Sequence, residues 1–558
     1  MVRKLLILVA AAGALAVPAD AGRRASSQIV AQSLLMPGVS YQRQVEFTPR
    51  GPVVLDVVIA PRPDGSLYTL APSLSNNAVV GTETLTGMEK DVTATTTAVG
   101  VNGDFFAANP GGPTGIVVRG GVLDSAPISS RSSLGIALDG TLTIARVAFD
   151  GIWHGSGQRR QLDLNAPPVA GHTTLYTPAW GPATPAENGV VEDVIGSLPP
   201  TGPSQIVTGA VTQVVQQGGT PIPPGGAVLV ARGAQAQYLT AEAPAGSNVD
   251  IRLTLTPNWS GMAGAIGGGP LLVSGGKAVF RANEAFDPAQ LNTRSARTAV
   301  GQLADGRILL VNVEGGSSAY SVGMTNYELA TALTRLGAAT AMGLGSGPSA
   351  GIAFDGTLLS RPSAGVEQPV SDALLLSYNG VYAAPPATDV LSPNGDGVDD
   401  TQTFTYKLVR ASQVTATLSG PGGVTVPLAQ DAEQPGVHML QWSGPGAEGD
   451  WQFTVTATDD QGRSTSAERD FSVNDTLGSL SVSSAAVTFQ LTHPAKVTVN
   501  LENGNGIVVA TLLLKKLAAG PQRVTWTGRP RSGLRVRVIA TNSIGTVSLL
   551  TPFTARRH

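Results

Sequence analysis

Three positions in the sequence carry side chains of the kind that hydrolytic sites use. Asp104 ends the run Asn102-Gly103-Asp104, which follows an apolar strand pattern at residues 99–101. Glu314 ends a second apolar run at residues 308–313, and Arg297 lies shortly before that run. A carboxylate can activate water or stabilise a developing positive charge, and a guanidinium can bind two oxygens of a phosphate at once. These residue types suit hydrolysis beside an anionic group.

Each of these residues also has a purely structural explanation. Asn102-Gly103 is favourable turn chemistry, and Asp104 could cap that turn. Arg297 could belong to a structural ion pair, and Glu314 could be a solvated strand end. The residue types alone leave both explanations open.

The segment 297–378 contains the clearest pattern of elements in the chain. Val, Ile and Leu at residues 308–313 follow an Asp-Gly turn, which indicates a buried strand. A capping box at residues 325–328 begins a predicted helix, and an apolar stripe follows at Leu329, Leu333 and Leu336. Gly337 suits the left-handed residue that ends a helix. The capping box also explains Glu328 without any catalytic role.

A Gly-rich turn at residues 343–349 comes next, followed by a predicted hairpin around Asp355-Gly356 and a closing strand at residues 370–376. In this order the segment resembles the phosphodiester glycosidase family. The matching motifs begin with Arg297-Thr298-Ala299-Val300-Gly301 and continue through the acid-ended strand, the helix and the closing strand. Residues 102–106 and 265–272 extend the resemblance upstream.

The resemblance implies a mostly β, α+β catalytic domain that hydrolyses glycosyl-1-phosphodiester bonds. It assigns the catalytic carboxylates to Asp104 and Glu314, and substrate binding to Asn102 and Arg297. Such a substrate carries a good leaving group, so a strong general acid matters less than a carboxylate beside C1. One departure stands out: Gly343 and Gly345 occupy positions where the family usually has Asn and Asp.

Composition limits the class of protein and its partners. The chain has 558 residues and a formal net charge of −3, and it has no cysteine. No basic run of the nucleic-acid-binding type occurs, so neither DNA nor RNA is an expected partner. Thiol catalysis, thiolate metal sites and disulfides are excluded. The expected partner is a glycan or glycosyl-phosphodiester substrate, and no organic cofactor is expected.

The first 21 residues have the pattern of a signal peptide. Arg3-Lys4 precedes an apolar region at residues 5–17, and Ala19-Asp20-Ala21 predicts cleavage before Gly22. The apolar region is too short to cross a bilayer as a helix, and no later segment is predicted to cross one. We therefore expect a secreted or cell-surface protein, with cell-wall association through its C-terminal modules as one possibility.

The C-terminal part contains an internal repeat of alternating strand patterns. Residues 404–418 correspond to residues 487–501, and residues 453–459 correspond to residues 536–542. Each unit has the pattern of a small β-sandwich and is similar to the Ig-like module of the flagellar hook cap protein. The predicted division is a signal peptide at 1–21, a glycosidase-like domain at 22–384, and Ig-like modules at 385–475 and 476–558.

A second chemical motif opens the first Ig-like module. Its oxygen-bearing side chains are spaced by glycines, which suits a hard cation such as calcium in a structural role. The alternative is a solvated Asp/Gly turn. The predicted ligands are Asn394, Asp396, Asp399 and Asp400.

Two functions from different classes fit this sequence. The first is an exported hydrolase that cleaves glycosyl-1-phosphodiester linkages in envelope or extracellular glycans. The second is a glycan-binding or cell-surface interaction protein that has the same fold but no turnover. Gly343 and Gly345 suggest this function, because they replace two polar residues that the family usually has. A third and weaker hypothesis, an adhesin-like structural protein, does not account for the ordered motifs before residue 377.

Overall fold

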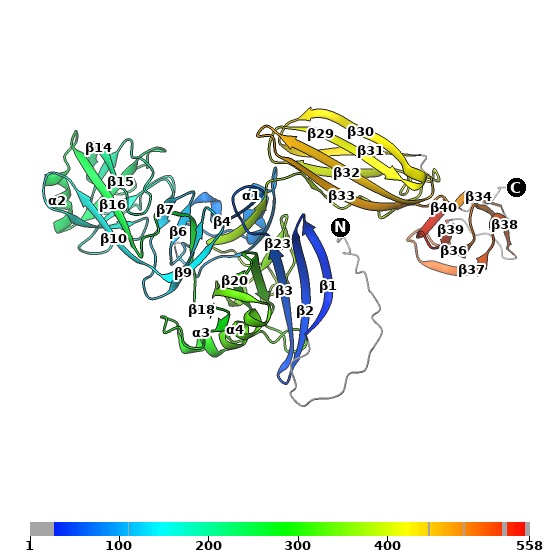
Figure 1. The fold of residues 1–558 in the computed structure, drawn as a ribbon, viewed down its shortest axis with the longest axis horizontal. Helices are drawn as coiled ribbons and strands as arrows, with labels where there is room; N and C mark the ends of the chain where they lie inside the picture. Colours follow the sequence, from blue (N-terminus) through cyan, green and yellow to red (C-terminus); the bar gives the residue numbers. More distant parts are fainter. Residues whose placement is uncertain (1–26, 110, 445–446, 484–485, 527–532, 553–558) are drawn as a thin grey trace. The chain divides into compact units, whose positions relative to one another are not determined.

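The chain forms two compact units, residues 1–379 and 380–558, in the computed structural model (Figure 1). The structure describes residues 27–109, 111–444, 447–483, 486–526 and 533–552. The predicted signal peptide lies outside these residues. The mostly β character expected from the sequence is confirmed, because strands dominate both units.

An eight-stranded antiparallel sheet forms one side of the first unit. Its central strands are apolar and buried on both faces, as residues 308–313 predicted. In spatial order the sheet consists of β1 (Ser27–Met36), β2 (Val39–Thr48), β3 (Gly51–Ala60), β21 (Ile308–Val313), β20 (Arg297–Leu303), β22 (Ala338–Gly343), β18 (Leu271–Ser274) and β19 (Lys277–Ala278).

Helix α4 (Asn326–Arg335) packs on this sheet through its apolar stripe. Thr325 and Glu328 form the predicted capping box, and Leu329 and Leu333 are buried. Gly337 adopts φ +91°, so the predicted end of the helix is confirmed as well. Short helices α1 (Leu85–Val92), α2 (Ala234–Glu242) and α3 (Pro288–Asn292) complete the described helices, none of which is long and apolar enough to cross a bilayer.

A second sheet carries the motif that ends in Asp104. Its strands are β24 (Thr357–Leu358), β23 (Ile352–Phe354), β5 (Thr97–Asn102), β25 (Asp372–Tyr378) and β4 (Tyr68–Leu74). The hairpin β23–β24 turns at Asp355 and Gly356, both with positive φ, as the Asp-Gly pair predicted. Because β5 pairs with β25, Asn102 lies opposite Ala373.

A third sheet and a closed barrel account for residues 117–267. The third sheet consists of β7 (Val122–Ser125), β6 (Val117–Arg119), β17 (Met262–Gly267), β8 (Ser132–Ala137) and β9 (Leu142–Arg146). The barrel consists of β10 (Ala148–His154), β11 (Arg160–Leu164), β12 (Thr173–Tyr176), β15 (Ala227–Arg232), β13 (Val190–Ile195), β14 (Ile206–Val215) and β16 (Asn248–Thr256). Trp153 and Trp259 are buried in the core that these two parts share.

The second unit contains two β-sandwiches of corresponding strand order, except that the first has an additional edge strand, β27 (Val390–Leu391). The first pairs β26 (Tyr382–Ala383), β28 (Gln402–Leu408) and β31 (Gly436–Trp442) against β27 (Val390–Leu391), β33 (Ser464–Val473), β32 (Gly449–Asp459), β29 (Ser412–Gly420) and β30 (Val424–Glu433). The second pairs β34 (Leu477–Val482), β35 (Ala486–Leu491) and β38 (Gly520–Thr525) against β37 (Val508–Leu517), β36 (Ala495–Glu502), β39 (Arg535–Thr541) and β40 (Thr546–Pro552).

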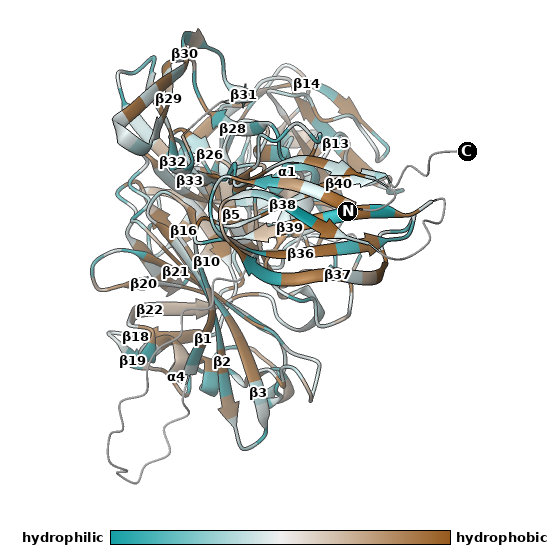
Figure 2. Ribbon diagram, turned by 90° about the vertical axis from the view of Figure 1, so that its right-hand side faces the viewer, coloured by the Kyte–Doolittle hydropathy of each residue, from teal (hydrophilic) through white to brown (hydrophobic). Residues whose placement is uncertain are grey.

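The sequence repeat corresponds to this structural repeat, because β28 and β29 occupy the same positions in the first sandwich as β35 and β36 occupy in the second. Strand β36 changes between hydrophilic and hydrophobic residues along its length, as a strand with one face in a core should (Figure 2). The segment 383–388, which has linker composition, is part of the first sandwich. Ala384 and Ala387 donate backbone hydrogen bonds to Thr405 and Thr403.

Candidate active site

Asn102 is held by three segments of the first unit. Its Oδ1 accepts hydrogen bonds from Thr298 Oγ1 at 2.6 Å and from the Gly351 amide at 3.0 Å. Its Nδ2 donates to the Gly345 carbonyl at 3.0 Å. The side chain is buried, and these contacts satisfy its polar atoms within the protein. Asn102 thus joins β5 to β20 and to the Gly-rich turn.

Asp104 lies beside a second buried carboxyl group, that of Asp372. The Asp104 amide donates to Asp372 Oδ1 at 2.9 Å, and the Gly103 amide donates to the Asp372 carbonyl at 2.8 Å. Asp104 is 3% exposed and Asp372 is 0% exposed. The pair arises because β25 begins, at Asp372, next to the end of β5, and Asp104 follows that end by two residues.

Burial raises the pKa of both carboxyl groups, and the charge of Asp104 adds to the rise at Asp372. The pKa of Asp104 rises to about 6, mainly because burial penalises its charge, although the Phe105 amide at 2.7 Å opposes the rise. The pKa of Asp372 rises to about 8, because it is buried and lies next to the negative charge of Asp104. Asp372 Oδ2 has no hydrogen-bond partner among the described residues. Near neutral pH the pair therefore carries a single negative charge, mainly on Asp104.

The backbone of two glycines passes very close to the Asp104 carboxylate, which also accepts a hydrogen bond from Thr114 Oγ1 at 3.4 Å. A Cβ atom at Gly115 would come within 2.7 Å of Asp104 Oδ2, and one at Gly267 within 2.3 Å. The motif at residues 265–272 supplies Gly267, so its glycines have a steric role here. A larger residue at either position would displace the carboxylate.

Arg131 supplies positive charge near Asp104 and lowers its pKa. Its guanidinium lies 4.5 Å from the ring centroid of Phe286 and 5.2 Å from that of Phe105. Its Nε donates to the Ala285 carbonyl at 3.2 Å. Sequence analysis did not select Arg131, because a single arginine between serines gives no pattern. The two aromatic rings and the guanidinium form a cationic, partly exposed edge beside the carboxyl pair.

Arg297 is buried and bound to backbone carbonyls. Its Nε donates to the Met324 carbonyl at 3.0 Å, and a terminal nitrogen donates to the Thr293 carbonyl at 2.7 Å. Burial lowers its pKa to about 10. Within the described residues, the hydrogen bonds of Arg297 go to backbone carbonyls and to no carboxylate. It fixes the segments on either side of β20 and β21.

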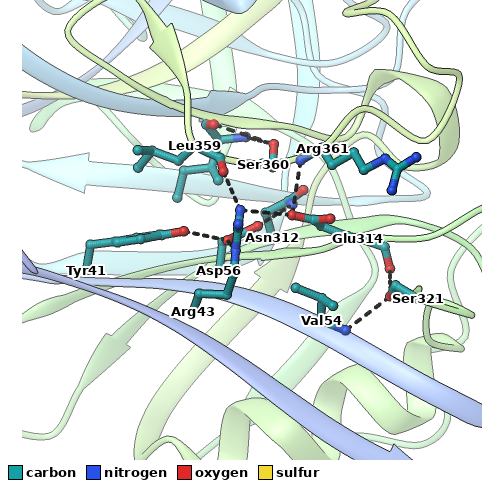
Figure 3. A network of polar contacts seen from close by, with 11 residues as sticks. Tyr41, Arg43, Val54, Asp56, Asn312, Glu314, Ser321, Leu359, Ser360 and Arg361 are labelled. Carbon is teal, nitrogen blue, oxygen red and sulfur yellow. Dashed lines mark hydrogen bonds and ion pairs between the residues drawn. The ribbon is translucent and has the colours of Figure 1, made fainter. Parts of the chain in front are cut away.

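Glu314 belongs to a different polar network, at the end of β21 (Figure 3). Arg43 lies between two acids, 3.0 Å from Asp56 Oδ1 and 3.2 Å from Glu314 Oε1. The Arg361 amide donates to Glu314 Oε1 at 3.0 Å, and Tyr41 donates to Asp56 at 2.7 Å. Burial and the neighbouring Asp56 raise the pKa of Glu314 to about 7.

The contacts that hold Asp104 and those that hold Glu314 share no residue in the described chain. The structure therefore places the two predicted catalytic acids in separate networks. The partner it gives Asp104 is Asp372, which sequence analysis noted only as part of the closing strand. Arg43 and Asp56 were also missed, since they lie outside the motifs.

Gly343 and Gly345, which replace the Asn and Asp of the family pattern, lie where backbone segments pass very close together. A Cβ atom at Gly345 would lie 2.8 Å from Asn102 Nδ2 and 3.0 Å from the Asp104 carbonyl. One at Gly343 would lie 2.9 Å from the Gly269 carbonyl. Neither position has room for a side chain in this arrangement.

The predicted calcium loop is closed by its own hydrogen bonds. Asp400 accepts from the amides of Gly395 at 2.7 Å and Gly397 at 2.6 Å, and Asp396 accepts from the Val398 amide at 2.9 Å. Within the described residues, the one group of three acidic or imidazole side chains with converging ligand atoms is elsewhere in the second unit. It consists of Glu448, Asp475 and His493.

Two family models match parts of the chain. The phosphodiester glycosidase model matches residues 201–377, and the FlgD Ig-like domain model matches residues 474–537. The first match contains Arg297, Glu314 and Asp372, whereas Asp104 lies before it.

Individual relatives share part of the chain. The SPbeta prophage-derived uncharacterized protein YomE of Bacillus subtilis is 34% identical over 90 residues, which is 16% of this chain and 14% of that protein. A hypothetical protein from Synechocystis has a crystal structure that is 27% identical, with a TM-score of 0.52 over 61% of this chain and 62% of that one. The catalytic domain of zebrafish N-acetylglucosamine-1-phosphodiester alpha-N-acetylglucosaminidase gives 14% identity and a TM-score of 0.33 over 62% of this chain and 86% of that one. The chain spans less than two thirds of the length of the first two.

Proposed function

We propose that this chain, which contains a phosphodiester glycosidase domain and a FlgD Ig-like domain, is an exported hydrolase of glycosyl-1-phosphodiester linkages in envelope or extracellular glycans. The phosphodiester glycosidase family is a hydrolase family. Catalysis by this chain, its glycan substrate and its export are proposed here on the basis of the site described above.

The buried carboxyl pair supports this proposal most strongly. With pKa values of about 6 and 8, Asp104 is ionised and Asp372 protonated near neutral pH. An ionised carboxylate in a buried site can accept a proton from a water molecule as the oxygen of that water bonds to C1 of the sugar. The bond from C1 to the phosphate oxygen then breaks, and a phosphate monoester leaves with the bonding electrons.

The surroundings of the pair suit this reaction. The Arg131 guanidinium can bind phosphate oxygens while it stacks on Phe105 and Phe286. Asp372 keeps its proton and so does not add a second negative charge beside the leaving phosphate. Asp104 is therefore the catalytic residue of the proposal, and Asp372 sets its charge.

Specific observations also favour the second function, a glycan-binding protein without turnover. The polar atoms of Asn102 are satisfied internally, and Arg297 is bound to carbonyls. Gly345 has no space for the aspartate that the family usually carries there. The binding function remains the alternative that activity measurements must separate from hydrolysis.

The decisive experiment measures release of free sugar by the purified full chain from a panel of sugar 1-phosphodiesters. We expect turnover in the wild type and a loss of about 10²–10⁴-fold in Asp104→Asn, the range for removal of an acid–base group. Asp193→Asn is a matched control. Asp193 is another buried acid, in β13 of the barrel, and its pKa is raised to about 7.

Glu314→Gln tests whether the network of Arg43, Asp56 and Glu314 takes part in hydrolysis. A larger loss in Glu314→Gln than in Asp104→Asn would move the reaction to the Arg43 network. Absence of turnover by folded wild-type protein on every substrate would favour the binding function.

A further inference from the structure

A cleft of about 300 Å³ lies beside the candidate active site, and neither the carboxyl pair nor the Glu314 network uses it. One wall is the loop of residues 279–286, and the other is formed by the end of α3 and the start of α4. Helix α4 packs on β18 and β19 directly below this loop. The helix and strands that carry the walls of the cleft adjoin one another at one end of the eight-stranded sheet, where α3, α4 and β18 lie close together (Figure 1).

Two exposed aromatic rings stand at the cleft. Phe280 is 63% exposed and Tyr327 is 56% exposed, and their ring centroids are 4.6 Å apart. Because the two rings are in contact, they form one contiguous apolar patch, and an apolar patch rimmed by polar residues is a feature of ligand-binding grooves. The electron-rich face of an aromatic ring attracts C–H groups that carry partial positive charge, and the flat face of a pyranose ring presents such groups.

Free amide groups surround the aromatic pair. The side-chain amides of Asn283, Asn292 and Asn326 line the cleft and form no hydrogen bond within the described part of the chain. Each amide offers both a donor and an acceptor, which matches the hydroxyl groups of a sugar. An aromatic platform bordered by unpaired amides and by Arg281 is suited to a polyhydroxylated ring rather than to an apolar ligand.

The cleft is held in shape before any ligand binds. Glu284 accepts hydrogen bonds from Ser132 N and Oγ, both at 2.8 Å, and from the Leu271 amide at 2.7 Å. These bonds use both carboxylate oxygens, so Glu284 anchors the loop and is not available as a base. On the other wall, the capping box fixes the first turn of α4, which carries Asn326 and Tyr327.

Phe286 connects the cleft to the carboxyl pair. It lines the cleft, and its ring centroid lies 5.4 Å from that of Phe105, the residue that follows Asp104. The Arg131 guanidinium also stacks on Phe286. A ligand in the cleft would therefore be the neighbour of a phosphodiester held at Arg131.

From these contacts we infer that the cleft is a glycan subsite, in which a pyranose ring of an oligosaccharide stacks on Phe280 and Tyr327. This inference rests on the proposed function for its substrate class. It adds that the protein recognises more than one sugar of a chain, with the additional ring bound away from the scissile bond.

The test is isothermal titration of the full chain with cellotetraose, chitotetraose and mannotetraose as probes. We expect at least one probe to bind, and Phe280→Ala and Tyr327→Ala each to weaken Kd about three- to tenfold, as loss of one aromatic stacking contact implies. Tyr327→Phe should retain binding. Phe47→Ala, which removes another ring that is 63% exposed, on β2, is the matched control.

Two results would overturn the subsite. One is no binding of any probe by folded wild-type protein, and the other is equal affinity in the wild type and both alanine variants. Asp104→Asn separates this inference from the hydrolase proposal. Binding that persists in Asp104→Asn and depends on Tyr327 supports the subsite whether or not the wild type turns over.

Discussion

The central feature at the scale of residues is a pair of buried aspartates that share a hydrogen bond across two strands. Asp104 and Asp372 are acidic in the unfolded chain, and both hold protons more strongly once folded. Burial is the main cause for both, and the charge of Asp104 adds to it for Asp372. The burial that raises both pKa values therefore lowers folding stability at high pH, whatever the role of the pair in the proposed hydrolysis.

The pH dependence of stability tests this pair. A raised pKa means that the folded protein binds more protons than the unfolded one, so stability decreases as pH rises from about 4 to about 8. In Asp372→Asn the amide keeps the acceptor for the Asp104 amide and cannot ionise. Relative to the wild type, its free energy of unfolding should improve by roughly 1–3 kcal/mol between pH 5 and pH 8.

Urea unfolding at a series of pH values measures this difference. Asp305→Asn is the control, since Asp305 is an exposed acid with a lowered pKa, so its profile should parallel the wild type over this range. A constant difference between Asp372→Asn and the wild type from pH 5 to pH 8 would contradict the assignment.

The Gly-rich turn at residues 343–349 is the element that brings the sheets of the first unit together. The Gly345 amide donates to the Gly103 carbonyl at 2.8 Å, and the Gly345 carbonyl accepts from Asn102. The Leu344 amide donates to the Thr298 carbonyl at 2.9 Å. The turn thus joins β5 to β20 through backbone hydrogen bonds. This close approach leaves no space for side chains at Gly343 and Gly345.

Restoring the aspartate that the family usually has should therefore damage the fold rather than repair the site. Gly345→Asp places a Cβ atom 2.8 Å from Asn102 Nδ2, so the turn or Asn102 must shift. We expect a loss of about 1–3 kcal/mol in the free energy of unfolding, as for an overpacked core position.

Urea unfolding with Gly261→Asp as the matched control measures this cost. Gly261 has no heavy atom within 4 Å of a built Cβ atom, so that variant should unfold like the wild type. A Gly345→Asp variant that is as stable as the wild type and turns over substrate faster would show that the turn adapts, contrary to this prediction.

At the scale of the whole molecule, two units with separate cores should respond separately to ligands. The first unit contains the carboxyl pair and the cleft, and the second contains the loop of residues 394–400. Calcium binding at this loop, which the sequence predicts, would stabilise only the unit that binds the ion. The carboxylates of the loop already cap its own turns, so calcium would have to compete with those hydrogen bonds.

Differential scanning calorimetry of the full chain should show two unfolding transitions. We expect added calcium to raise one Tm, EDTA to reverse the change, and Asp400→Asn to abolish it. If calcium changes neither Tm, the prediction of calcium binding is wrong. A shift that survives Asp400→Asn and disappears in Asp475→Asn would place the ion at the group of Glu448, Asp475 and His493 instead.

Local patterns were sufficient for the elements whose signals lie in neighbouring residues. The capping box and apolar stripe of α4, the Asp-Gly hairpin and the repeat of strand patterns all appear in the structure as predicted. The phosphodiester glycosidase domain was predicted from the resemblance of its ordered motifs to that family, not from composition or spacing. The mostly β fold follows from the local signals. They depend on hydrogen bonds and packing between residues close in sequence, which composition and spacing record directly.

The partners of the chemical residues depended on contacts between residues far apart in the chain. Asp104 meets Asp372 only because β5 pairs with β25. Glu314 meets Arg43 only because β3 pairs with β21 on one side and with β2 on the other. Closure of the barrel and the cleft beside Phe286 likewise require several segments to pack at once. The sequence by itself indicated Asp104, Glu314 and Arg297 as side chains that could do chemistry, but it did not indicate Asp372 or Arg131. Only the tertiary structure decided which of them share a low-dielectric environment, because that depends on strand pairing across hundreds of residues.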